Sequence, residues 1–177
     1  MSKKIAYHID RLRTLHEGQV IQLNTTHFSD MTEISKHFKN GLSEHGIRYF
    51  SDLNAFANIG YFNSTLIEHC IETMRLISFP NVPSRFQSLF AIPTLDELDS
   101  WEELYGDYPI YEVEYDTNNS IQLDASNLKG GINEETGEFS PCYLLSYAKN
   151  YLSGKIGENP KMEILIPLPV KIGKRVR

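Results

Sequence analysis

A short apolar run near the end of the chain constrains the fold more than any other stretch. Residues 161–167 read Lys-Met-Glu-Ile-Leu-Ile-Pro, and Pro160 and Pro167 bound this run. An apolar run this short between prolines is typical of a strand in a buried sheet. Side chains alternate between the faces of a strand, so Glu163 and Leu165 share one face and Met162, Ile164 and Ile166 share the other. Both faces are therefore predicted to be covered.

The carboxylate of Glu163 is the unusual feature of this predicted strand. A partly buried carboxylate is costly unless it has partners or a chemical task. Two interpretations follow from the sequence alone: an exposed residue near the start of the strand, or a functional group on a covered face.

The composition is that of one ordinary domain. A chain of 177 residues fits a single domain over 1–177 with a sizeable core. The net charge of -6 argues against broad, non-specific nucleic-acid binding. A local basic groove stays open, because Lys171, Lys174, Arg175 and Arg177 cluster at the end of the chain.

Several classes of protein are disfavoured by what the sequence lacks. No apolar run is long enough to cross a bilayer, and the first residues lack the apolar region of a signal peptide. Cys70 and Cys142 have no metal or redox spacing, and the six histidines lack close pairing. We therefore expect a reduced, cytoplasmic protein without a metal site or a membrane segment.

The predicted elements favour an α+β fold rather than a doubly wound sheet, because strands lie at both ends of the chain and helices lie between them. Ser140 and Pro141 predict a helix start, and Thr94 with Glu97 has the spacing of a capping box. The phosphate-binding loop, the dinucleotide fingerprint and the Gly-x-Ser-x-Gly elbow are all absent. The predicted strands are 4–9, 18–23, 84–91, 108–115, 162–167 and 170–176, and the clearest helices are 32–40, 65–78, the segment after 94 and the segment after 141.

Three sequence blocks follow one another along the chain: Tyr-His-Ile-Asp-Arg at 7–11, Ser-Arg-Phe-Gln-Ser-Leu-Phe at 84–90, and the run that contains Glu163. The order of these blocks resembles that of the ADP-ribosyltransferase superfamily. Members of that superfamily carry a first-strand His or Arg, a middle strand with Ser or an aromatic residue, and a late strand that opens with Glu. The chain also looks like a bacterial family of uncharacterised proteins with the same blocks. The middle block departs from the pattern, since Ser-Thr-Ser is absent and no Tyr stands where the His-Tyr-Glu branch has one.

The resemblance implies a split antiparallel sheet with flanking helices and NAD+ as co-substrate. Cleavage of the nicotinamide–ribose bond passes through an oxocarbenium-like ribose, which a nearby carboxylate stabilises. Glu163 is the candidate for that carboxylate, and His8 would hold a ribose hydroxyl. Arg11 or Arg85 would grip the pyrophosphate. The expected NAD+ contacts are Tyr7, His8, Arg11, Arg85, Phe86, Ser88 and Phe90, with Phe86 or Phe90 stacking on nicotinamide.

Each of these residues also has a plain structural interpretation. His8 is alternatively interpreted as a core histidine on a strand. Phe86 and Phe90 are alternatively interpreted as core aromatic residues. Arg85 is equally a solvated strand residue, and Arg11 equally pairs with Asp10 at the surface.

The resemblance further implies a toxin of a toxin–antitoxin or phage-defence system. Its acceptor would be a nucleic acid, an RNA or DNA base, or alternatively a protein side chain, and an antitoxin protein would cover the NAD+ site. Tyr143, Tyr147 and Tyr151 are spaced along one helical face, and with the basic tail they could form a stacking groove for a single strand. The same row is typical of a packed helical face. A catalytically inactive binding module on this fold and a partner that only binds another protein are the remaining alternatives.

Overall fold

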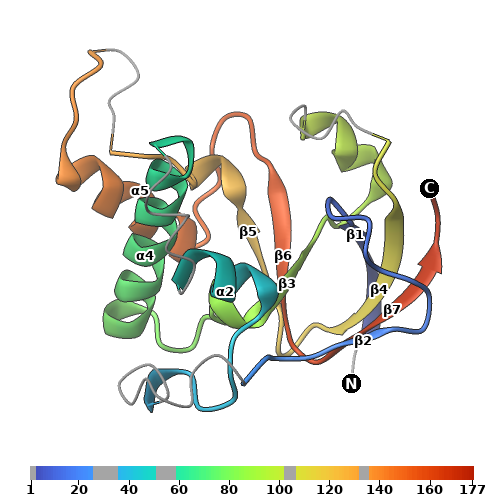
Figure 1. Cartoon of the computed structure of the whole chain (residues 1–177). Helices are drawn as coiled ribbons and strands as arrows, with labels where there is room; N and C mark the ends of the chain where they lie inside the picture. The colour runs from blue at the N-terminus through green and yellow to red at the C-terminus, as the bar shows by residue number, and fades with distance from the viewer. Residues whose placement is uncertain (1–2, 26–35, 51–58, 102–106, 132–135) are drawn as a thin grey trace.

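The strands form two antiparallel sheets that lie side by side (Figure 1). The structure is a computed structural model, and it describes residues 3–25, 36–50, 59–101, 107–131 and 136–177. One sheet has the strand order β1-β4-β7-β2 and the other has the order β3-β6-β5. The strands are β1 (Lys3–Ile9), β2 (Val20–Ile21), β3 (Ser88–Ala91), β4 (Ile110–Asp116), β5 (Ile121–Asp124), β6 (Met162–Pro167) and β7 (Val170–Arg175).

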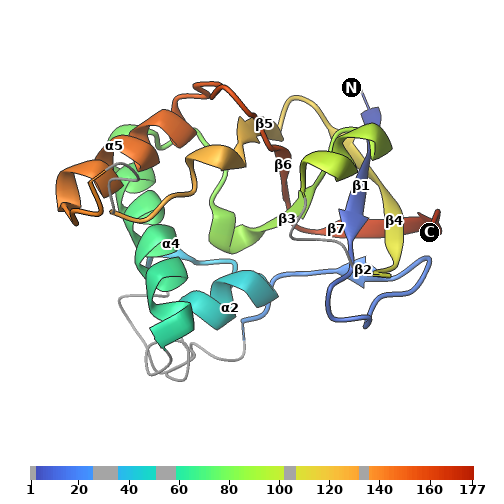
Figure 2. The ribbon, with the colours of Figure 1, turned by 90° about the horizontal axis from the view of Figure 1, so that it is seen from above.

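The α-helices gather beside the three-stranded sheet, as Figures 1 and 2 both show. Helices α4 and α5 pack against each other, and α2 packs against the short helix η2. The result is an α+β domain, as the order of predicted elements indicated. The helices are α2 (Glu44–Phe50), α4 (Ile59–Ser78) and α5 (Pro141–Leu152), and the 3-10 helices are η2 (Arg85–Gln87), η3 (Leu95–Ser100) and η5 (Ala125–Asn127).

The two sheets are joined at one backbone bridge. Tyr7 of β1 and Ile92, which directly follows β3, exchange two hydrogen bonds of 2.9 and 2.8 Å. Because β1 and β3 come from different sheets, this bridge brings the first predicted block next to the middle one.

Strand β6 is covered on both faces, as predicted. Ile164 and Ile166 belong to the core that both sheets build with Val113 and Ile172. Leu165 points the other way, into the core formed with α4 and α5. Glu163 shares the face of Leu165, so the fold directs its carboxylate toward the helices rather than toward solvent.

Most of the predicted elements are present with shifted ends. Helix α5 begins as expected, because the Ser140 hydroxyl accepts a 3.2 Å hydrogen bond from the backbone N–H of Cys142. Strand β5 and helix α2 were not predicted. Residues 32–35 of the helix expected over 32–40 lie outside the described residues.

Three local predictions are wrong. Residues 85–87 form the helical turn η2 rather than a strand, because the hydroxyl of Ser84 accepts from the N–H of Phe86 and starts a turn there. Thr94 makes no side-chain cap, and a 3-10 helix follows it. Ile77, expected in the buried stripe of α4, is 76% exposed at the end of that helix.

Candidate functional site

One pocket of about 400 Å³ lies where the two sheets meet. Its wall combines residues of β1, α2, β3 and β6, so it draws on both ends of the sequence. His8 and Glu163, predicted to lie in one site, both line it. Of the residues expected to contact NAD+, the pocket is lined by Tyr7, His8, Arg11, Arg85, Ser88 and Phe90 but not by Phe86.

Glu163 is buried and clamped through one of its two oxygens. Its Oε1 accepts a 2.6 Å hydrogen bond from the Tyr151 hydroxyl and an ion-paired hydrogen bond from Nη1 of Arg85. Among the described residues, none donates a hydrogen bond to Oε2. The clamp therefore fixes the carboxylate and leaves one oxygen for a ligand in the pocket.

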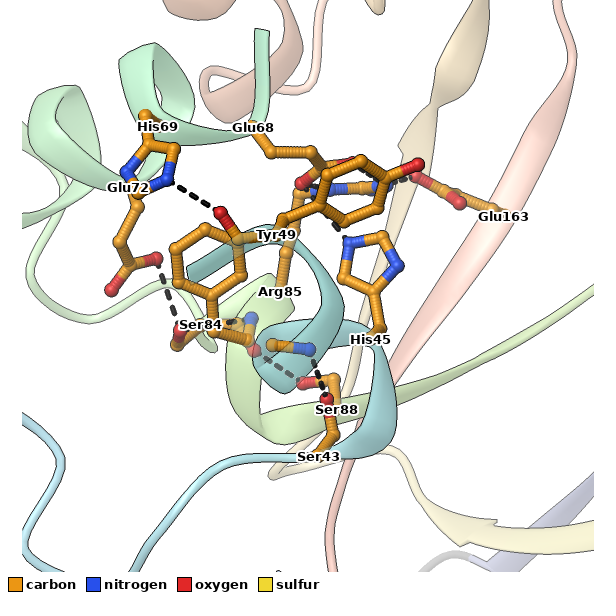
Figure 3. Close-up of polar contacts among 12 residues, drawn as sticks. Ser43, His45, Tyr49, Glu68, His69, Glu72, Ser84, Arg85, Ser88 and Glu163 are labelled. Atoms are coloured by element: carbon orange, nitrogen blue, oxygen red, sulfur yellow. Dashed lines mark hydrogen bonds and ion pairs between the residues drawn. The ribbon is translucent and has the colours of Figure 1, made fainter. Parts of the chain in front are cut away.

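Arg85 is the centre of the polar cluster, and Figure 3 shows it between Glu68 and Glu163. Its Nε and Nη2 atoms donate to the two oxygens of Glu68 at 2.8 and 2.9 Å. Its Nη1 also donates to the Tyr151 hydroxyl at 2.6 Å. Burial disfavours the charge of this guanidinium, but Glu163 and Glu68 outweigh burial and hold the pKa of Arg85 well above its usual value.

Burial and neighbouring charges also set the protonation states of Glu68 and Tyr151, two partners of Arg85. Burial alone would raise the pKa of Glu68, but Arg85 and then His45 lower it, so this pKa lies well below the usual range. Burial raises the pKa of Tyr151 well above its usual value. Glu68 is therefore ionised near neutral pH, and Tyr151 keeps the proton that it donates to Glu163.

His8 presents one ring nitrogen to the pocket. Its Nδ1 lies 2.7 Å from the backbone carbonyl oxygen of Phe90, which can only accept, so we assign the ring proton to Nδ1. Burial lowers the pKa of His8, which favours the neutral ring. Nε2 is then an acceptor for a ligand hydroxyl.

His45 enters the pocket from helix α2. The hydroxyl of Ser43 accepts from the N–H of Gly46 and caps this helix. A side chain on Gly46 would lie 2.4 Å from the carbonyl oxygen of Phe86, so the glycine allows α2 to approach η2 closely. Nε2 of His45 lies 3.2 Å from Oε2 of Glu68.

The sequence matches a family model over residues 6–177, which includes all of these pocket elements. The description of that family is "Protein of unknown function (DUF2441)". The chain belongs to this family. No curated protein matches the chain.

Two of the expected NAD+ contacts in this DUF2441 protein need correction. Phe86 is fully buried and packs with Phe38 and Leu42, so it cannot stack on a ligand in the pocket. Arg85 is neither solvated nor free to grip a pyrophosphate, because its donors point at Glu68, Tyr151 and Glu163.

Three other expected contacts keep their place in the pocket. Phe90 lines it, although Arg85 lies 4.5 Å over its ring. Ser88 lines it, and its hydroxyl donates to the carbonyl of Ser84 at 2.7 Å. Arg11 is exposed beside the pocket, and within the described residues no ion pair joins it to Asp10, whose carboxylate accepts from the N–H of Leu15.

The expected stacking groove does not form. Tyr151 is fully buried and binds Arg85 and Glu163 instead of facing solvent. Helix α5 and the end of β7 also lie on opposite sides of the molecule in Figures 1 and 2, so the tyrosine row and the basic tail are far apart.

Glu68, His45 and Tyr151 are site residues that the sequence reasoning missed. Glu68 lies three residues before Ile71 on α4, and residues at this spacing share one helical face. Because Ile71 is buried, its position is the sequence signal that Glu68 also points inward. Tyr151 was noticed only as part of a row. Within the described parts of the chain, no three metal-ligating side chains are grouped, and no helix has the length and apolar character needed to cross a membrane.

Proposed function

We propose that this protein is an NAD+-dependent ADP-ribosyltransferase. The observation that supports this best is that His8 and Glu163 line one pocket, although they come from opposite ends of the chain. A pocket of about 400 Å³ with a few fixed polar groups has the size and chemistry of a small-molecule site. We also propose that its split pair of sheets is the ADP-ribosyltransferase-like arrangement.

In the proposed reaction the bond between nicotinamide and C1′ of the ribose breaks. The bonding electron pair leaves with nicotinamide, and the ribose becomes oxocarbenium-like. The free Oε2 of Glu163 stabilises that positive charge, and a fixed charge in a water-excluded site supplies about 3 kcal/mol or more. Nε2 of His8 accepts a hydrogen bond from a ribose hydroxyl and positions the sugar.

The clamp on Glu163 is compatible with this role. Arg85 would cancel the negative charge of Glu163 if it were alone, but Glu68 binds the same guanidinium with both oxygens. Two carboxylates and one guanidinium leave one net negative charge beside the pocket when His45 is neutral. Hydrogen bonds from Arg85 and Tyr151 also hold the carboxylate in one orientation, as electrostatic preorganisation requires.

We assign the proposed contact with the pyrophosphate of NAD+ to Arg11 and Arg48. Both line the pocket and both are exposed, so their guanidinium groups can meet phosphate oxygens. This assignment replaces Arg85, whose donors are committed inside the protein.

A nucleic-acid base remains the proposed acceptor, in a cytoplasmic toxin of a toxin–antitoxin or phage-defence system. The exposed arginines beside the pocket support it, because phosphate contacts position nucleic acids on proteins. A protein side chain is the alternative acceptor. An antitoxin protein would then act by covering the pocket.

One observation favours a second candidate, a binding module that kept the fold without the chemistry. Glu163 is ion-paired with Arg85, and such a pair is also a way to neutralise a carboxylate that no longer reacts. The two candidates differ in whether NAD+ is consumed.

Labelled NAD+ incubated with separate pools of RNA, DNA and protein distinguishes them. The wild type should label one pool, and Glu163→Gln should lose nearly all transfer at a temperature at which the variant is still folded, because Glu163 belongs to a buried ion pair. Glu158→Gln is the matched control, because Glu158 is exposed and does not line the pocket. Equal labelling by Glu163→Gln would remove Glu163 from the mechanism. NAD+ binding without transfer would favour the binding module, and neither binding nor transfer would reject both candidates.

A further inference from the structure

We propose that His45 is the proton acceptor for the group that attacks the ribose and that Glu68 positions its ring. This inference rests on the proposed transferase function and adds a base to it. His45 lines the same pocket as His8 and Glu163, but it comes from α2, which belongs to neither sheet.

The surroundings of His45 hold the ring in one orientation. Its Nε2 lies 3.2 Å from Oε2 of Glu68, and Figure 3 shows the ring below Glu68 and beside Tyr49. The ring packs edge-on against Phe90 with centroids 4.6 Å apart and lies 4.8 Å from the ring of Tyr49. The side chain is 23% exposed, so the ring still reaches solvent or ligand in the pocket.

One ring nitrogen is thereby left for chemistry. We assign the ring proton to Nε2, the buried nitrogen on the side of Glu68, although no described residue forms a hydrogen bond with it. Nδ1 is then the unprotonated nitrogen. A histidine with one nitrogen on a carboxylate and the other toward the substrate is the arrangement of a general base, since the carboxylate fixes the tautomer and stabilises the imidazolium.

The other candidate bases in the pocket are less suited. Glu163 is paired with Arg85, which weakens it as a base, and both oxygens of Glu68 bind the same guanidinium. His8 has a free nitrogen, but its Nδ1 partner is the neutral carbonyl of Phe90 rather than a carboxylate. Of the two described histidines in the pocket, His45 is the one whose ring nitrogen contacts a carboxylate, at 3.2 Å.

The proposed step balances in atoms and electrons. The bond from C1′ to nicotinamide breaks, and its electron pair neutralises the pyridinium nitrogen of the leaving group. A lone pair of the acceptor forms the new bond to C1′, and the proton of the acceptor passes to Nδ1 of His45. The imidazolium then faces Glu68 and later releases its proton to solvent.

Titratable groups surround His45 on every neighbouring element. They are Glu68 on α4, which contacts the ring, and in the same pocket Arg85 on η2, Glu163 on β6, and Glu44, Arg48 and Tyr49 on α2 itself.

The experiment measures label transfer from NAD+ to the pool that the wild type labels, as a function of pH. Wild-type transfer should fall as the pH is lowered, as expected of any reaction that needs an unprotonated general base. His45→Ala should lower the rate by roughly 10²- to 10⁴-fold, the usual contribution of a general base, with NAD+ binding changed less than about threefold. Added imidazole should restore part of the transfer by His45→Ala and none by Glu163→Gln. His16→Ala is the control, because His16 is exposed and does not line the pocket.

Two further variants separate catalysis from folding. His45→Gln keeps the side-chain volume and should flatten the acidic part of the pH profile. Glu68→Gln should shift that part of the profile without imidazole rescue.

Each outcome decides the question. An active His45→Ala with the wild-type pH profile would overturn this inference and leave the transferase proposal intact. Loss of transfer together with NAD+ binding, without rescue by imidazole, would make His45 a structural residue. A wild type that transfers nothing from NAD+ would overturn both proposals.

Discussion

The guanidinium of Arg85 and the carboxylate of Glu163 form an ion pair of which only 6% of each side chain is exposed. Arg85 lies on η2 and Glu163 on β6, two elements that are far apart in the sequence. They come close because β3, which directly follows η2, is the neighbour of β6 in the three-stranded sheet. A buried ion pair is strongly destabilising when one member is removed, because the other charge stays buried without compensation. This contact therefore ties the candidate site to the stability of the fold.

Replacing Arg85 with methionine should destabilise the protein severely. Glu68 and Glu163 would both lose their cation, and we expect the free energy of unfolding to fall by about 3–5 kcal/mol. Urea unfolding measures the change. Arg11→Met is the control, because Arg11 is exposed and should change stability by about 0.5 kcal/mol or less. Equal stability of the two variants would mean that the buried pair contributes nothing.

The hydroxyl of Tyr151 should matter more than that of Tyr147 on the same helix. The Tyr151 hydroxyl accepts from Arg85 and donates to Glu163, both at 2.6 Å. Tyr151→Phe should therefore cost about 1–3 kcal/mol of unfolding free energy. Tyr147→Phe is the matched control and should be nearly neutral, since Tyr147 is only half-buried. A neutral Tyr151→Phe would show that Arg85 alone holds the carboxylate.

Acid should destabilise the protein through Glu68. Burial opposes the low pKa of Glu68, but Arg85 and His45 depress it well below the unfolded value of about 4.3. Stability from this group is therefore complete above about pH 4.3 and is lost as the pH falls toward the folded pKa. Urea midpoints between pH 6 and pH 2 should decline less steeply in Glu68→Gln than in the wild type. Parallel curves would contradict the depressed pKa.

Asp124 should anchor the chain that leads into β6. Its carboxylate is fully buried and accepts from the N–H groups of Ser126, Gly157 and Lys161 at 2.9, 2.7 and 2.9 Å. Asp124→Ala leaves these donors without their acceptor, and we expect a loss of about 2–3 kcal/mol or more in thermal or urea unfolding. The exposed Glu158 lies in the same loop, so Glu158→Ala should be nearly silent.

Local sequence pattern was sufficient for the elements whose signals are local. The alternation of β6, the proline boundaries and the Ser140–Pro141 helix start all depend on neighbours within a few residues, and the structure has them. Arg85 shows where this fails. The alternation around Arg85 predicted a strand, but the Ser84 hydroxyl accepts a hydrogen bond from the N–H of Phe86 and a helical turn begins there. The side chain of Arg85 is buried because it pairs with Glu68 and Glu163, which are distant in the sequence.

The sequence by itself determined the α+β class and the covered faces of β6, because side-chain periodicity records which faces are apolar. Only the tertiary structure decided that Glu68, Arg85, Tyr151 and Glu163 share one buried cluster and that His45 lies beside it. The physical reason is that burying these charges is favourable only when they compensate one another, and that compensation arises from the packing of separate elements.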